Sequence, residues 1–423
     1  MQLSKRNLFK AATLAAGTAA MTPLARARRQ TAKAPALPNL SKRAVPISVA
    51  ERQARITRAQ KVMAKQGLDA LLLEPGSAMR YFTGISWWRS ERLTAIIIPR
   101  RGDIAIVTPF FEEPSVRESM TFGDDVRTWN EHENPFVRIA GMLKDRGLKR
   151  GRIGVEATVR YFVVEGLQRA APNFTVVGAS GVTRACRMFK SPAEIALMKI
   201  ASDITLRAYA HVHSQLDKGM TSDDINALMR QAQASLGGDS IWTMALLGES
   251  SAYPHGSHKP QTVEEGQIIL LDCGCAVEGY QSDISRTFVY GESSKQQRRI
   301  WELVRKGQLT ALAAAQPGRP AGSVDDAVRK LYEAEGFGPG YRLPGLSHRT
   351  GHGIGMDGHE PVNIVKGEST PLAAGMCFSN EPGIYLPGQF GVRLEDCIHM
   401  TDSGPVWFTV PPESLEKPIG RLG

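Results

Sequence analysis

The sequence predicts an α/β domain followed by a larger α+β domain. A length of 423 residues is enough for two domains. Residues 48–180 alternate strand-like and helix-like runs, which is typical of an α/β layer structure. Residues 181–423 combine well-capped helices with pairs of apolar strands, which favours helices that cover one side of a mostly antiparallel sheet.

The first domain is predicted to begin with a helix at Ala50–Lys65 and to contain a second helix at Phe162–Ala171. Its strands are short apolar runs bounded by turn residues. They are predicted at Ala70–Leu73, Thr94–Pro99, Ile104–Thr108, Arg152–Glu156 and Thr175–Val177. A short turn separates the second and third of these runs, so they are expected to form a β-hairpin.

A clear helix start opens the second domain. Ser191 is an N-cap residue, Pro192 takes the first helical position, and Glu194 completes a capping box. This helix is predicted to run towards Leu216. Further helices are expected from Thr221, over Gln297–Ala315 and over Val324–Glu335.

Two aspartates lie in a predicted hairpin of the second domain. Gln267–Cys275 is a strongly apolar strand, Glu278-Gly279 is a turn, and Tyr280–Tyr290 is the returning strand. Residues that face each other across a hairpin share one face of the sheet. Asp272 and Asp283 are therefore predicted to bind one cation jointly, although an aspartate pair in a hairpin is also common as a turn or edge feature.

Two glutamates repeat this arrangement. Glu381 ends the strand-like run Met376–Glu381, and Glu395 lies in the run Val392–Ile398 on the other side of the Pro387-Gly388 turn. Glutamates often lie on a solvated sheet face, but the neighbours here are apolar residues or glycine. Two acidic hairpins in one domain suggest an internal pseudo-twofold.

Histidines gather close to these acids in the sequence. His348, His352 and His359 fall within twelve residues, and His255 precedes the first hairpin. Any one of them could be a hydrogen-bonded core residue, but all four together are harder to explain in that way. Glycines flank His352 and allow close approach of a substrate.

Four carboxylates and one imidazole predict a site for two divalent metal ions. Carboxylate oxygens with a single imidazole suit Mn²⁺, Fe²⁺, Co²⁺ or Zn²⁺ better than a thiolate site would. Four crowded carboxylates repel one another unless cations neutralise them. Two divalent ions carry a matching charge, and such pairs support hydrolysis. The predicted ligands are Asp272, Asp283, His352, Glu381 and Glu395.

The stretches that hold these residues resemble the pita-bread metallopeptidases, which include methionine aminopeptidase, aminopeptidase P and prolidase. The matching segments read LLDCGCAVEGYQSDISRTF, HRTGHGIGMDGHE, FSNEPGIY and GVRLED, and the match spans about residues 181–410. The preceding α/β domain is similar to that of prolidases, aminopeptidases P and creatinases. The resemblance implies a pita-bread catalytic domain with a pseudo-twofold antiparallel sheet covered by helices, and a homodimer.

The resemblance also implies roles for single residues. Asp283 and Glu395 would bridge the two ions, Asp272 would complete one shell, and His352 with Glu381 would complete the other, with manganese as the first expectation. Glu381 would also take a proton from the attacking water. His255 and His359 would contact the substrate. Arg393 would orient Glu395, bind substrate or form a structural salt bridge, and His348 would lie beside the substrate site.

The expected activity is cleavage of Xaa-Pro peptide bonds, by a dipeptidase or by an aminopeptidase that acts on longer peptides. Some prolidases bind the free carboxylate of a dipeptide through an arginine shortly after the second histidine, but residues 360–363 read Glu-Pro-Val-Asn. The tyrosine that many relatives carry near Ile241 is also absent. A dipeptidase is the narrow preference. Non-peptide hydrolases and non-catalytic relatives are disfavoured because the ligand set is complete. A lyase is disfavoured because Cys273 and Gly274 follow Asp272, where some lyase relatives carry an extra aspartate ligand.

The basic residues of the chain are concentrated at its start. The net charge is +10, and residues 1–43 contain nine Lys and Arg and no acid, which leaves +1 for the rest. A nearly neutral globular part has no electrostatic footprint for nucleic acid. Residues 1–27 resemble a twin-arginine export signal with Lys5 at the first arginine, which predicts a periplasmic or secreted enzyme without a membrane span. Residues 28–47 are predicted to be a linker.

Overall fold

The structure is a computed structural model that describes residues 37–422. The predicted export signal lies outside these residues, as does the first part of the predicted linker. The remainder of the linker packs against the protein: Leu40 is buried, and its backbone N–H donates a 2.8 Å hydrogen bond to the carbonyl of Leu236. A short 3₁₀ helix, η1 (Ser41–Arg43), follows.

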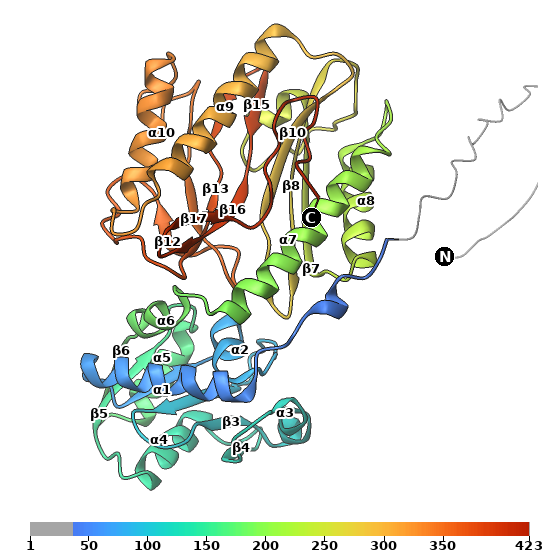
Figure 1. Ribbon diagram of the computed structural model, residues 1–423. Coiled ribbons are helices and arrows are strands. Elements are labelled where there is room, and N and C mark those ends of the chain that lie inside the picture. Colours follow the sequence, from blue (N-terminus) through green and yellow to red (C-terminus); the bar gives the residue numbers. More distant parts are fainter. Residues whose placement is uncertain (1–36, 423) are drawn as a thin grey trace, which may run out of the picture. The chain divides into compact units, whose positions relative to one another are not determined.

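The first domain is built on one mixed six-stranded sheet in the order β4-β3-β2-β1-β5-β6 (Figure 1). The β1–β2 and β2–β3 pairs are antiparallel, which confirms the predicted hairpin, and the other pairs are parallel. The strands are β1 (Ala70–Leu73), β2 (Ala95–Pro99), β3 (Ala105–Pro109), β4 (Val126–Trp129), β5 (Gly151–Val155) and β6 (Phe174–Gly178).

Both faces of this sheet are buried, as the continuous apolar strands require. Leu71 and Leu73 of β1 contribute to one hydrophobic cluster together with α1, α2 and α6, whereas Leu72 contributes to another with α4 and α5. The helices of this domain are α1 (Val49–Gln66), α2 (Ser77–Thr83), α3 (Glu113–Ser119), α4 (Pro135–Asp145), α5 (Tyr161–Ala170) and α6 (Ser180–Arg187), with a 3₁₀ turn, η2, at Phe110–Glu112.

The second domain contains antiparallel sheets in the orders β10-β8-β7 and β12-β11-β13-β16-β17, with β14 paired to β15 and β9 to β8. Its first strands are β7 (Asp239–Leu247), β8 (Gln267–Val277), β9 (Tyr280–Gln281) and β10 (Ile284–Tyr290). The later strands are β11 (Gly351–Gly353), β12 (Glu360–Ile364), β13 (Cys377–Asn380), β14 (Gly383–Leu386), β15 (Phe390–Arg393), β16 (Asp396–Thr401) and β17 (Gly404–Trp407).

Two pairs of helices cover these sheets. In the first pair, α7 (Pro192–His213) packs on β8 and α8 (Ser222–Ser235) packs on β7. In the second pair, α9 (Lys295–Ala314) packs on β13, β14 and β15, and α10 (Gly322–Ala334) packs on β12. Both members of the first pair begin with a capping box, at Ser191 as predicted and also at Thr221. A helix pair followed by an acidic hairpin thus occurs twice, as the sequence suggests. A short 3₁₀ helix, η3 (Gly248–Ala252), follows β7.

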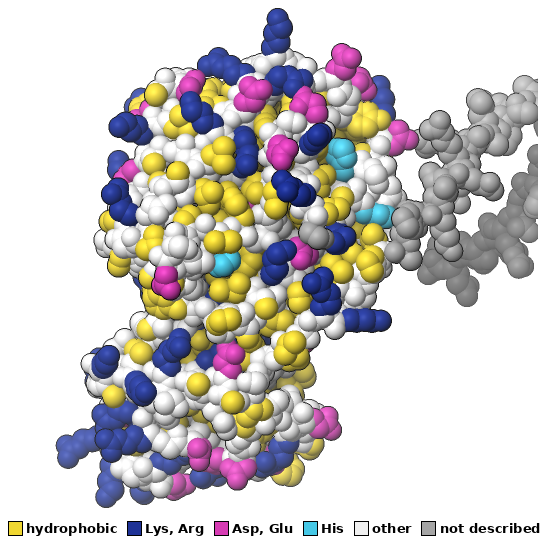
Figure 2. Space-filling model, in the orientation of Figure 1, with side chains coloured by type: hydrophobic (Ala, Val, Ile, Leu, Met, Phe, Trp, Pro, Cys, Tyr) yellow, Lys and Arg dark blue, Asp and Glu magenta, His cyan; other side chains and the backbone are white. Residues whose placement is uncertain are grey.

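The charged side chains of the surface are mixed, and the cysteines lie in the interior. Basic and acidic side chains are interspersed over the face of the second domain seen in Figure 2. All five cysteines are buried and free, and burial raises the pKa of the Cys186 thiol to about 11. Among the helices of residues 37–422, none combines the length and the apolar character that a membrane span requires.

Candidate metal centre

The first acidic hairpin differs in register from the prediction. Asp272 on β8 pairs with Ser285 on β10, and not with Asp283. Asp283 lies in the break between β9 and β10, where the regular ladder is interrupted. The break turns this carboxylate towards the second hairpin, so the two aspartates reach the same pocket from different points of the sheet.

The second acidic hairpin is interrupted at the corresponding place. Its ladder pairs Asn380 with Asp396 and resumes with Gly383 opposite Arg393, so Glu381 and Glu395 both lie in the break. The two hairpins meet where Ser285 and Glu395 form an isolated antiparallel bridge, with N–H···O distances of 3.3 and 3.2 Å. Each acid is therefore held by backbone that is fixed on both sides.

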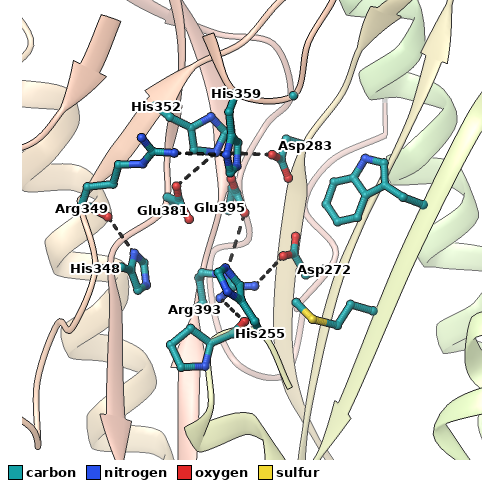
Figure 3. Close-up of a pocket in the computed structure, with 14 residues that line it drawn as sticks. His255, Asp272, Asp283, His348, Arg349, His352, His359, Glu381, Arg393 and Glu395 are labelled. Carbon is teal, nitrogen blue, oxygen red and sulfur yellow. Dashed lines mark hydrogen bonds and ion pairs between the residues drawn. The ribbon is translucent and has the colours of Figure 1, made fainter. Parts of the chain in front are cut away.

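All the residues predicted for the site line one pocket of about 400 Å³ (Figure 3). The pocket is lined by His255, Asp272, Asp283, His348, His352, His359, Glu381, Arg393 and Glu395. Five residues that the sequence did not single out complete it: Trp242, Met244, Pro254, Arg349 and Gly358. Trp242 and Met244 stand two residues apart on β7, so their side chains share one face and give the pocket an apolar wall.

Three potential ligands form the centre of the pocket. Single ligand atoms of Asp283, His352 and Glu395 all lie within 4.8 Å of one another. The Nε2 atom of His352 lies 3.3 Å from Glu381 Oε1 and 3.6 Å from Asp283 Oδ2. The Nδ1 atom of His352 is 3.1 Å from the carbonyl of Gly353, to which it can donate. That contact leaves the Nε2 lone pair facing the carboxylates, as a metal-ligating histidine requires.

The electrostatics of this cluster fit a cation. Burial, reinforced by the neighbouring acids, raises the pKa of Asp283 and of Glu395 well above the usual carboxyl range. Within residues 37–422, Glu395 Oε1 is buried and has no hydrogen-bond partner. Burial also lowers the pKa of His352 to about 4, which keeps its imidazole neutral. Crowded carboxylates, one of them with an oxygen that lacks a donor, next to a neutral imidazole form a donor set that divalent cations take.

Arg393 pairs with Asp272 more closely than with Glu395. Its Nη2 atom is 2.5 Å from Asp272 Oδ2, whereas its Nε atom is 4.0 Å from Glu395 Oε2. The Nε–H group also donates to Ser285 Oγ at 2.9 Å. Ser285 Oγ in turn lies 2.9 Å from Asp272 Oδ1 and 2.7 Å from Glu395 Oε2. Arg393 therefore orients Asp272 directly and Glu395 through Ser285.

The three other histidines of the pocket have different surroundings. His348 uses both ring nitrogens within the protein, at 2.7 Å from the Arg349 carbonyl and 2.7 Å from the Tyr385 hydroxyl. It therefore positions Tyr385, with no ring nitrogen left for a substrate. The ring centroids of His359 and His352 lie 4.0 Å apart, and burial lowers the pKa of His359 to about 4. His255 is an exposed residue of the pocket lining.

The loop that carries His359 is anchored by the next residue, Glu360. The buried Glu360 carboxylate accepts hydrogen bonds from the backbone N–H groups of Met356 and Asp357, at 2.9 and 3.0 Å. It also forms ion pairs with Arg187 and with Lys190. Burial opposes ionisation of Glu360, but these cations and the N–H groups lower its pKa to about 2.

We expect Glu360→Gln to lower the free energy of unfolding at pH 7 by about 3 kcal/mol, since a depressed acid pKa stabilises the folded state. This extra stability of the wild type is fully present above pH 4.5, the pKa of the Glu360 carboxyl in the unfolded chain. It is lost as the pH falls through about 2, the pKa in the folded protein. Urea unfolding between pH 7 and 2 measures it, with the exposed Glu302→Gln as the control. A difference that does not change with pH would contradict this explanation.

Two family models match the two domains of the chain. Residues 55–189 match the Creatinase/Prolidase N-terminal domain, and residues 196–402 match Metallopeptidase family M24. The Xaa-Pro dipeptidase of Lactobacillus delbrueckii subsp. lactis is 30% identical over 85% of this chain and 98% of its own length.

Solved structures of dipeptidases also match the chain over most of its length. The crystal structure of dipeptidase PepE from Mycobacterium ulcerans matches with a TM-score of 0.81 and 32% identity, covering 88% of this chain and 98% of that one. Prolidase from Thermococcus sibiricus matches with a TM-score of 0.78 and 28% identity, covering 84% and 96%. These are pita-bread folds, and their family uses divalent metal ions. The chain belongs to metallopeptidase family M24 and carries the creatinase/prolidase type of N-terminal domain.

Proposed function

We propose that this enzyme hydrolyses Xaa-Pro dipeptides with two divalent cations held by Asp272, Asp283, His352, Glu381 and Glu395. The observation that carries the proposal is the buried acidic cluster with the unpartnered Glu395 Oε1 atom, which opens into a pocket of about 400 Å³. Such a pocket suits a small substrate. Relatives that are Xaa-Pro dipeptidases or prolidases over most of this chain support the substrate class.

Bound cations would supply Lewis acidity and a water that is deprotonated near neutral pH. The residues of the chain do the remaining work. Glu381 lies against His352 Nε2 and accepts a 3.2 Å hydrogen bond from the Ser379 hydroxyl, which fixes its carboxylate for accepting a proton from the water. His359 is neutral. Its Nδ1 atom lies against Arg349, so its Nε2–H group is the one offered to the substrate carbonyl. The wall formed by Trp242 and Met244 suits the proline ring.

Removal of metal is expected to abolish hydrolysis of Ala-Pro, and added Mn²⁺ is expected to restore it. The reason is that the acidic cluster repels an attacking oxygen unless cations neutralise it. The experiment measures Ala-Pro turnover after chelation and dialysis, and again after addition of Mn²⁺, Co²⁺, Zn²⁺ or Fe²⁺. Ala-Ala serves as the control substrate. Full turnover by metal-free protein would contradict the proposal, and efficient hydrolysis of Ala-Ala would contradict the proline requirement.

Three finer predictions belong to this proposal. Manganese is the proposed native metal, because four carboxylates and one imidazole form a mostly hard ligand set. The proposed homodimer is tested by light scattering in solution. Export is tested by fractionation of cells that express the full chain, which should place the enzyme outside the cytoplasm if residues 1–27 act as a signal.

A further inference from the structure

The pocket contains one cation that the mechanism above does not use. Arg349 precedes β11, and Figure 3 shows its guanidinium pointing towards the imidazoles of His352 and His359. Its Nη1 atom donates to Asn363 Oδ1 at 2.7 Å, and its Nη2 atom lies 3.2 Å from His359 Nδ1. Asn363 lies on β12, opposite His352 in the β11–β12 pair, so the strand pair fixes the guanidinium beside the site.

This guanidinium differs from the other arginines near the centre. Arg187, Arg329 and Arg393 each form an ion pair with a carboxylate of the protein. Within residues 37–422, no carboxylate oxygen lies within 4.0 Å of the Arg349 guanidinium, and its only side-chain partners are neutral. A half-buried cation beside an active site with no anionic partner is a binding group for an anion from outside.

The contacts leave a free set of donors on Arg349. A guanidinium has five N–H groups in a planar fork. Asn363 and His359 occupy one each, so both terminal nitrogens keep a second N–H group for a carboxylate. By donating to Nδ1, Arg349 also directs the N–H of His359 to Nε2, on the side of the ring away from Arg349.

We propose that Arg349 binds the free carboxylate of the substrate's proline residue and thereby makes the enzyme a dipeptidase. This inference rests on the proposed function. In an Xaa-Pro dipeptide the carboxylate is two bonds beyond the scissile nitrogen, so it remains within one residue length, roughly 3.8 Å, of the groups that act on that bond. Arg349 touches His359, one of those groups. A longer peptide would place a neutral amide at this position and leave the guanidinium without an anion.

The position of Arg349 also resolves a difficulty in the sequence. No arginine follows His359, where some prolidases carry their carboxylate-binding residue. Asn363 occupies that stretch and holds Arg349, which lies just before the neighbouring strand β11. The guanidinium is thus supplied by a residue before His352 and is positioned by a residue after His359.

The test compares Ala-Pro with Ala-Pro-amide and Ala-Pro-Ala, using metal-reconstituted wild-type enzyme, Arg349→Met and Arg349→Lys. Wild type is expected to prefer Ala-Pro over the amide by about 10- to 100-fold in kcat/KM, because the amide leaves the cation unpaired. In Arg349→Met this preference should fall to about one, because the loss of kcat/KM on Ala-Pro should exceed the loss on the amide, which reports only the contact with His359. Arg349→Lys should keep part of the preference. The exposed Arg342→Met is the matched control and should behave like wild type.

The contradicting outcomes are distinct. Equal loss on Ala-Pro and on its amide in Arg349→Met would mean that Arg349 acts only through His359. A wild-type enzyme that cleaves Ala-Pro-Ala as well as Ala-Pro would overturn carboxylate recognition but keep the Xaa-Pro activity. If Arg349→Met lost kcat/KM on Glu-Pro but not on Gln-Pro, Arg349 would bind an acidic side chain of the first substrate residue instead. Failure of the reconstituted wild type on every proline peptide would contradict the proposed function itself. Thermal unfolding of each variant excludes loss of the fold.

Discussion

Asp283→Asn is expected to lower kcat for Ala-Pro by about 1000-fold or more, as removal of a central electrostatic group does in other enzymes. Asp283 is buried, and its Oδ2 atom lies 3.6 Å from His352 Nε2. An amide of the same shape cannot supply the negative charge that holds a cation there. Metal content, measured by mass spectrometry after dialysis, should fall from two ions per chain to one or none.

The same substitution should stabilise the metal-free protein. Burial and the nearby acids raise the pKa of Asp283, so its ionised form at neutral pH opposes folding when no cation is bound. Asn removes that charge, and the melting temperature of the chelated variant should exceed that of chelated wild type. The exposed Asp326→Asn, on α10, is the matched control and should change neither turnover nor metal content. Wild-type turnover by Asp283→Asn with two bound ions would refute the bridging role.

His359→Ala is expected to lower kcat by about 100- to 1000-fold, the range of a positioned proton donor, while metal content stays at the wild-type level. His359 is not among the three residues whose ligand atoms cluster within 4.8 Å. Its Nδ1 atom is taken by Arg349, which leaves an outer N–H group for the substrate or the leaving nitrogen. Burial first, and then His352 and Arg349, lower the pKa of His359 to about 4, so it stays a neutral donor above pH 5.

Two measurements separate this role from a structural one. Single-turnover kinetics on Ala-Pro should show slower chemistry in His359→Ala, and mass spectrometry should show unchanged metal. The exposed His258→Ala serves as the control, because it removes a nearby histidine that does not line the pocket. Loss of metal from His359→Ala would identify this residue as a ligand.

Local sequence signals were sufficient to predict the main helices and hairpins. The Ser191 capping box is present in the structure, with the Glu194 carboxylate on the Ser191 backbone N–H at 2.8 Å. The strand β1 has the predicted bounds, because four consecutive apolar residues in a sheet buried on both faces leave little room for error. The metallopeptidase family was also predictable, since the acids and the histidine occur in short segments of specific spacing.

Tertiary interactions decided what the sequence could not show. The breaks at Asp283, Glu381 and Glu395 depend on how the two hairpins meet at Ser285, which no local pattern specifies. The helix α2 went unpredicted because most of its residues are buried, so it has no amphipathic pattern. The helix α4 did carry a signal, an Asn134 cap followed by proline, that the prediction did not use.

Arg349 was missed for a different reason. A basic residue beside glycines and histidines looks like any surface arginine in the sequence, and only the fold brings Asn363 and His359 to its guanidinium. Trp242 and Met244 were likewise hidden, because an apolar pair on a strand predicts core packing as readily as a pocket wall.

Anomalous diffraction from crystals of the manganese-loaded enzyme tests the central claim most directly. We expect two peaks per chain, one between Asp272 and the Asp283–Glu395 pair, and one between that pair and His352 with Glu381. No peak within this pocket, or a single ion held by residues outside this set, would contradict it.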